Sequence, residues 1–161
     1  MKTATLKELK NELEHYSQEE LISVCLRLVK FKKENKEFLN YLLFGANNEI
    51  NYIENIKIEI DEQFNQINTS SFYFIKKSIR KILKTIKKYI QYSQKNETEI
   101  ELLIYFCQKL NKMKPNIHTN NVLKNLYSRQ IDNIKRTIAK LHDDLQYDYN
   151  LDLNKLTEII E

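Results

Sequence analysis

The sequence predicts an all-α fold, and three observations support this prediction. The 161 residues include one glycine and one proline, so the turn residues that hairpins and phosphate-binding loops need are nearly absent, whereas helix interiors need neither. Apolar residues recur at the three- and four-residue spacing of amphipathic helices. The polar residues between them have the form of helix caps. We therefore expect one domain, 1–161, of about seven antiparallel helices, arranged as a bundle or as a short superhelix.

Two capping-box sequences predict the first two helices. Thr5 pairs with Glu8, and Ser17 pairs with Glu20. Seven of the nine residues from 21 to 29 are apolar, so we expect this second helix to be covered on most sides and to lie centrally. A third helix, 34–44, should end at Gly45 in a left-handed cap.

Five further helices are expected after Asn48, which can cap the first of them. This helix should bury a stripe made of Ile53, Ile56, Ile60, Phe64 and Ile67. A basic helix covers 72–93, and Asn96 with Glu99 imitates a capping box that opens a central apolar helix ending near 112. After a loop at 113–121, a long helix should bury Val122, Leu126, Ile134, Ile138, Leu141 and Leu145. A short helix, 152–160, follows.

The basic helix raises the functional question. Between residues 63 and 96 the chain has eight Lys or Arg side chains and no carboxylate, whereas the remainder has 18 basic and 22 acidic side chains. On a helical wheel the cationic side chains fall within an arc of about 140°, opposite an apolar arc of about 120°. The apolar arc holds Ile75, Ile79, Ile82, Leu83, Ile86, Tyr89 and Ile90. The candidate binding face is Lys76, Lys77, Arg80, Lys81, Lys84, Lys87 and Lys88, with Tyr73 projecting within it and Tyr92 at its edge.

Like charges four residues apart on a helix repel, so this face needs a neutralising partner. The partner can be acidic residues of another helix, an acidic protein, nucleic acid or a membrane surface. The first alternative has Glu54, Glu59, Asp61, Glu62, Asp143 and Asp144 available. Only Arg80 offers a forked donor, so lysines would supply mainly sequence-independent attraction to phosphate. Tyr73 offers a platform on which a single-stranded base could stack.

Catalytic signatures are weak. His142, Asp143 and Asp144, with His118 and Asp148, invite comparison with metal-dependent phosphohydrolases, but adjacent helix positions diverge by about 100°. Cys25 and Cys107 lie in apolar segments, where a thiol behaves as a small hydrophobic group. We assign no catalytic residue, no metal ligand and no cofactor.

The pattern of the chain indicates a cytoplasmic protein. The sequence contains no run of about 18 apolar residues, which a membrane-spanning helix would need. The first 16 residues mix charges with leucines, unlike a signal peptide. Two cysteines do not form the dense framework of a secreted disulfide scaffold.

The stretch LKELKNELEHYSQEELISVCLRLVKFKKENKEFLNYLLFG resembles the opening of a family of uncharacterised, all-helical proteins from Bacteroidetes-type bacteria. The shared form is a leucine-lysine helix, a Ser-x-Glu-Glu-like cap, an apolar helix and an aromatic-rich helix. The resemblance implies a helical fold and a bacterial cytosolic origin, and it transfers no activity. The leading interpretation is a non-enzymatic binding or scaffold protein that presents the basic face. The alternatives are a nonspecific nucleic-acid-binding protein and, more remotely, a His/Asp metal-dependent hydrolase.

Overall fold

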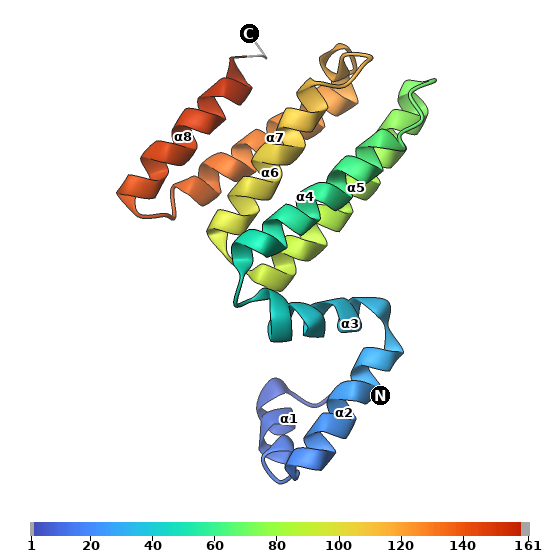
Figure 1. Ribbon diagram of the computed structural model, residues 1–161, viewed down its shortest axis with the longest axis vertical. Helices are drawn as coiled ribbons and strands as arrows, with labels where there is room; N and C mark the ends of the chain where they lie inside the picture. The colour runs from blue at the N-terminus through green and yellow to red at the C-terminus, as the bar shows by residue number, and fades with distance from the viewer. Residues whose placement is uncertain (1, 159–161) are drawn as a thin grey trace. The chain divides into compact units, whose positions relative to one another are not determined.

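The computed structural model describes residues 2–158 and is all-α over that range (Figure 1). Eight α-helices, one π-helical turn and one 3-10 turn account for 80% of the described residues, among which no strand occurs. The predicted fold class is confirmed. The chain folds into two compact units, Met1–Phe44 and Gly45–Glu161, and each is described by itself. The single-domain interpretation stays a prediction.

The first unit contains α1 (Leu6–Leu13), α2 (Gln18–Phe31) and α3 (Lys33–Asn40), followed by a π-helical turn at Tyr41–Gly45. Both predicted capping boxes form. The backbone N–H of Thr5 donates to Glu8 Oε2 over 2.7 Å, and the backbone N–H of Ser17 donates to Glu20 Oε2 over 2.7 Å. The helix starts therefore lie where the sequence predicted them.

Two expectations for this unit were wrong. No residue of α2 is buried, and Ile22 and Leu26 are about half exposed, at 51% and 50%. Within the unit α2 packs chiefly against α3, and three short helices have too little surface to enclose it. Gly45 forms no left-handed cap, because no glycine among the described residues has a positive φ. The turn before it closes as a π-helix instead.

The second unit contains five α-helices and a short 3-10 turn (Figure 1). They are α4 (Glu49–Asn65), α5 (Phe72–Ser93), α6 (Asn96–Asn111), η2 (Ile117–Thr119), α7 (Asn121–Ile138) and α8 (Asp143–Thr157). Figure 1 shows the hairpins α4–α5 and α6–α7 side by side, with α8 beyond the second. Helix α6 contacts α4, α5, α7 and α8. It is therefore the central helix, as the sequence predicted.

The core of this unit forms around α6 and the apolar face of α5. Half of the sixteen residues of α6 are buried, among them Ile100, Leu102 and Phe106 at 0% exposure. The predicted stripe of α4 also packs inward, since Ile53, Ile56 and Ile60 are buried and Phe64 and Ile67 are half-buried. Burial of a large apolar side chain stabilises a fold by about 1.5–3 kcal/mol. This core holds α5 in place through its isoleucines.

The expected capping box at the start of α6 is absent, because Lys95 is the N-cap and makes no side-chain capping bond. A carboxylate from another helix holds this end. Glu49, the first residue of α4, accepts hydrogen bonds from Ser93 Oγ and from Thr98 Oγ1, the latter over 2.6 Å, and pairs with Lys95 Nζ at 2.9 Å. The α5–α6 turn is thereby tied to α4. Lys95, one of the eight cations counted in the basic segment, is neutralised here.

The last two helices differ from the prediction. Helix α7 ends at Ile138, and α8 begins at Asp143, where the sequence predicted one continuous helix through Leu145 and a second from 152 to 160; residues 159–161 lie outside the described residues. Adjacent carboxylates in a first turn are favoured by the helix dipole, and Asp143 and Asp144 occupy that position in α8. The buried side of α7 is Leu123, Tyr127, Gln130, Ile131, Ile134, Thr137 and Ile138. Val122 and Leu145, which were expected inside, are each 39% exposed.

Candidate functional site

Helix α5 separates charge from apolar surface along 22 continuous residues. Ile75, Ile79, Ile82, Leu83 and Ile86 are buried, as predicted, and Tyr89 and Ile90 are half-buried. On the other side Lys77, Arg80, Lys81, Lys84 and Lys87 are exposed, whereas Lys76 and Lys88 are half-buried. We call these seven cationic residues the basic face. The structure therefore forms the predicted amphipathic helix without a break.

Ion pairs among the described residues leave most of this face without a neutralising carboxylate. Apart from Lys88, no member of the basic face has a carboxylate oxygen within 4.0 Å among residues 2–158. Four residues of separation on a helix correspond to about 6 Å of rise, so Lys77 and Lys81, like Arg80 and Lys84, stand close together as like charges. Apart from Lys88, therefore, no ion pair with a described carboxylate relieves the repulsion within the face.

The acidic residues of α4 that were candidates to neutralise the face pair elsewhere. Glu54 pairs with Lys57 at 2.8 Å, and Glu59 accepts a hydrogen bond from the hydroxyl of Tyr89 over 2.6 Å. Asp61 pairs with Lys109 Nζ of α6 at 2.9 Å. These contacts tie α4 to α5 and to α6. The carboxylates of Glu54, Glu59 and Asp61 are therefore engaged within the second unit.

The contacts of Asp61 also change the pKa values of Asp61 and of its partner Tyr105. Burial opposes its charged form, but hydrogen bonds from Lys109 and Tyr105 and the charge of Lys109 outweigh burial, so the pKa of Asp61 lies below its usual value. Burial, followed by the hydrogen bond to Asp61, raises the pKa of Tyr105 to about 12. Both groups therefore keep their ordinary charges near neutral pH.

The other proposed acidic partners also form no ion pair with the basic face among the described residues. Asp144 lies 3.8 Å from His142 Nδ1 at the start of α8, and both side chains are exposed. Glu62 and Asp143 are exposed and form no ion pair with another described residue.

The two tyrosines near the basic face have different environments. Tyr73 is 68% exposed and, with Lys76, Lys77 and Arg80, lines a hollow of about 390 Å³. Tyr92 is half-buried. Its ring makes an edge contact with that of Tyr89 at a centroid distance of 6.0 Å. Tyr73 is therefore the accessible aromatic side chain of the site, as predicted, and Tyr92 belongs to an aromatic cluster.

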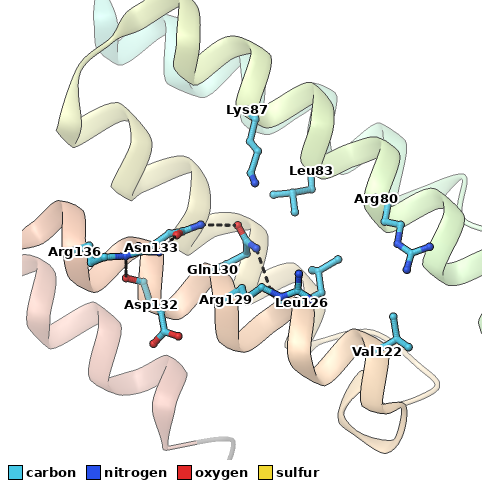
Figure 2. A pocket seen from close by; sticks show the side chains of 10 residues that line it. All are labelled: Arg80, Leu83, Lys87, Val122, Leu126, Arg129, Gln130, Asp132, Asn133 and Arg136. Atoms are coloured by element: carbon cyan, nitrogen blue, oxygen red, sulfur yellow. Dashed lines mark hydrogen bonds between the residues drawn. The ribbon is translucent and has the colours of Figure 1, made fainter.

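A second feature, which the sequence analysis missed, lies between α5 and α7. A groove of about 370 Å³ separates these helices, and Figure 2 shows Arg80, Leu83 and Lys87 pointing from α5 toward α7. The facing residues of α7 are Val122, Leu126, Arg129, Gln130, Asp132, Asn133 and Arg136. Four cationic side chains and one carboxylate line the groove, so its net charge is positive.

Hydrogen bonds within α7 orient its two groove arginines. Arg136 Nη2 donates to Asn133 Oδ1 over 2.6 Å, and Arg129 Nε donates to the carbonyl of Asn125 over 3.3 Å. A guanidinium has five N–H donors, so these bonds leave donors available. Neither arginine lies within 4.0 Å of a carboxylate oxygen in the described range.

A signal for this groove is present in the sequence. Val122, Leu126, Arg129, Asn133 and Arg136 recur at three- and four-residue steps, which places them on one face of a helix. Three of the chain's four arginines line the groove. Apolar periodicity instead predicts that Val122 and Leu126 lie on the buried side of the helix, and this prediction gives no indication of a groove beside the arginines.

The histidine and aspartate residues considered as metal ligands are not brought together. No group of three or more His, Cys, Asp or Glu side chains within residues 2–158 is placed to hold a metal ion. His118 lies in a polar network in which its Nε2 is 2.9 Å from Asn111 Oδ1, and its Nδ1 is buried with no hydrogen-bond partner. The geometry therefore gives the metal-hydrolase alternative no support.

The two thiols differ in environment. Cys107 is buried in α6, and burial raises the pKa of its thiol, which disfavours a nucleophilic thiolate. Cys25 is exposed on α2, where it lines a mainly apolar pocket together with residues such as Leu28 and Phe38. Neither forms a disulfide. In the described part of the chain no helix combines the length and apolar character that crossing a membrane requires.

Comparison of the chain with protein-family models, curated proteins and solved structures finds no match. The resemblance to an uncharacterised bacterial family therefore stays an expectation.

Proposed function

We propose that this protein is a non-enzymatic binding protein that attracts nucleic acid, without sequence preference, to the basic face of α5. One observation carries the proposal. Six cationic side chains of this face have no carboxylate within 4.0 Å in the described part of the chain, although the chain has 22 acidic residues. Phosphates would relieve the repulsion that these side chains exert on one another.

Lysine chemistry favours nucleic acid over an acidic protein as the partner. Exposed lysine is depleted at protein–protein interfaces, whereas interfaces with nucleic acid are strongly positive and are dominated by phosphate contacts. Six of the seven cationic residues of the basic face are lysines. They act as flexible point charges, which suits a backbone of repeated phosphates better than one defined carboxylate geometry.

We propose a binding protein and not an enzyme because of the chemical groups that line the site. The basic face and the groove carry amines, guanidiniums and amides, with a single carboxylate, Asp132. These groups bind anions and do not provide a paired acid and base. We place the protein in the cytoplasm, where two unpaired thiols fit a reducing environment, and where it would act as a scaffold for its nucleic-acid partner.

Fluorescence anisotropy with labelled single-stranded and duplex oligonucleotides tests the proposal. The test variant replaces Lys77, Lys81 and Lys84 with Gln. The matched control replaces three exposed lysines that each pair with a carboxylate, namely Lys10, Lys33 and Lys155. We expect the test variant to lose at least about tenfold in affinity at low salt and the control to lose little.

Flat anisotropy of the wild-type protein at low salt would overturn the proposal. Equal losses in the two variants would show that net charge alone, and not the basic face, attracts the oligonucleotide. If the protein bound an acidic protein and neither oligonucleotide, the result would show that the partner of the basic face is an acidic protein.

A further inference from the structure

We infer that the nucleic acid bound by this protein is single-stranded, and that its path runs from the Tyr73 hollow over Arg80 into the groove between α5 and α7. The inference rests on the proposed function and adds the class of nucleic acid and the residues that select it. Arg80 lines both the hollow and the groove. The two concave surfaces are therefore adjacent at this residue.

The first supporting observation is the aromatic side chain at the start of this path. Tyr73 is 68% exposed, and its ring lies beside Lys76 and Lys77 in the same hollow. Proteins bind single strands by combining a positive groove with aromatic rings on which unpaired bases stack. A duplex keeps its base faces inside the stack and has none to place on Tyr73 along its length.

The second observation is the lining of the groove. Its α5 wall carries Arg80 and Lys87, and its α7 wall carries Arg129 and Arg136. Apolar groups are also part of these walls, since Leu83 of α5 and Val122 and Leu126 of α7 line the same space. Phosphates can be held at such walls while base faces meet the apolar groups, and guanidinium planes can themselves stack on bases.

The third observation concerns charge and space. Asp132 is the one carboxylate among the groove residues, and Figure 2 shows its side chain directed away from α5. The volume of about 370 Å³ falls within the range of pockets that hold small organic ligands. The groove can thus admit a group of about the size of one nucleotide from a flexible strand.

The test compares single-stranded and duplex oligonucleotides of about 20 nucleotides, measured at about 50 mM salt by fluorescence anisotropy. Oligothymidylate is the single-stranded probe, because it does not fold on itself. The groove variant is Arg129→Gln with Arg136→Gln. Its control is Lys124→Gln with Lys135→Gln, which removes the same charge from exposed positions of the same helix outside the groove lining.

We expect the wild-type protein to bind oligothymidylate at least about tenfold more tightly than the duplex. The groove variant should lose most of this preference, whereas the control should keep it. Tyr73→Ala should weaken single-strand binding by at least about fivefold, and Tyr73→Phe should preserve it because the ring remains. The Tyr73 variants change an exposed side chain, so they keep the test valid if the double arginine variant fails to fold.

The outcomes separate the two proposals. Binding of neither probe defeats the proposed function and this inference together. Salt-sensitive binding with equal affinity for both probes, or with the groove variant and its control behaving alike, leaves the basic face as a nucleic-acid site and overturns the single-strand path. If Tyr73→Ala binds the single-stranded probe as tightly as wild type, Tyr73 is not a stacking platform. The proposed path would then be wrong at the residue where it begins.

Discussion

Replacing Lys84 with Gln should make the protein more stable at low salt, even though it removes a charge from the proposed binding surface. Lys84 is exposed, and its neighbours at the three- and four-residue spacings are all cationic: Arg80, Lys81, Lys87 and Lys88. Each like-charged pair at such a spacing destabilises a helix by about 0.2–0.5 kcal/mol. Solvent screening favours the lower end of that range, so four pairs amount to about 1 kcal/mol.

The free energy of unfolding, measured by urea denaturation at low and at high salt, checks this value. An increase of about 1 kcal/mol corresponds to a rise of about 2–4 °C in Tm for a chain of this size, and high salt should remove it because the repulsion is screened. Lys and Gln have similar helix propensities, so backbone effects are small.

The matched control is Lys135→Gln on α7. Lys135 is also exposed, but its neighbours at the same spacings are Ile131, Asp132, Ile138 and Ala139. Removing its charge should leave the protein equally stable or slightly less stable. If Lys84→Gln were neutral or destabilising at low salt, the basic face would have to be neutralised by the chain itself, and the reasoning from unrelieved repulsion would be refuted.

Three further predictions concern the second unit. Burial lowers the pKa of His118, so the folded state disfavours its protonation. The free energy of unfolding should therefore fall as the pH decreases below the ordinary histidine value of about 6.5, and His118→Gln should flatten this dependence in pH-dependent urea melts. Asp61→Asn should cost about 1 kcal/mol in the same denaturation assay and lower the pKa of Tyr105 from about 12, seen as an earlier step in the ultraviolet titration of tyrosine. Phe106→Ala removes a fully buried ring and should cost about 3–5 kcal/mol, and a loss below 1 kcal/mol would contradict the placement of this side chain in the core.

Periodicity was sufficient to predict α5 because its two stripes do not overlap. Every third or fourth position from Ile75 to Ile90 is apolar, and the lysines occupy the opposite side, so only one rotation of the helix buries the isoleucines. The observed bounds, Phe72–Ser93, match the predicted range of 72–93. The strongly apolar composition of α6 likewise indicated a central helix, and the structure places it there.

Helix α7 shows where periodicity fails. Two overlapping stripes run along it, one through Val122 and Leu126 and the other through Leu123, Tyr127 and Ile131. Both stripes continue into the same isoleucines near the C-terminal end of α7. The pattern alone therefore does not indicate which of the two stripes is buried. The structure buries the second stripe. The first lies at the edge of the core, where Val122 is exposed and the half-buried Leu126 both packs against the core and lines the groove.

The groove itself depends on tertiary packing. Arg80 and Arg129 are 49 positions apart in sequence, and they face one space because α4, α5 and α7 are all arranged around α6. The prediction that α2 would be covered on most sides was wrong for a related reason. Apolar composition predicts that a side chain avoids water, but it does not supply the surface that covers it, and the first unit has too few helices to do so.

The salt dependence of single-strand affinity tests the central claim most directly, because it counts the phosphates that the basic face engages. The slope of the logarithm of the association constant against the logarithm of the salt concentration changes by about 0.7 for each phosphate neutralised on a single strand. Replacing Lys77, Lys81 and Lys84 with Gln should therefore reduce the magnitude of the slope by about 2 relative to wild type. The control triple variant at Lys10, Lys33 and Lys155 should keep the wild-type slope, and an unchanged slope in the basic-face variant would contradict the account.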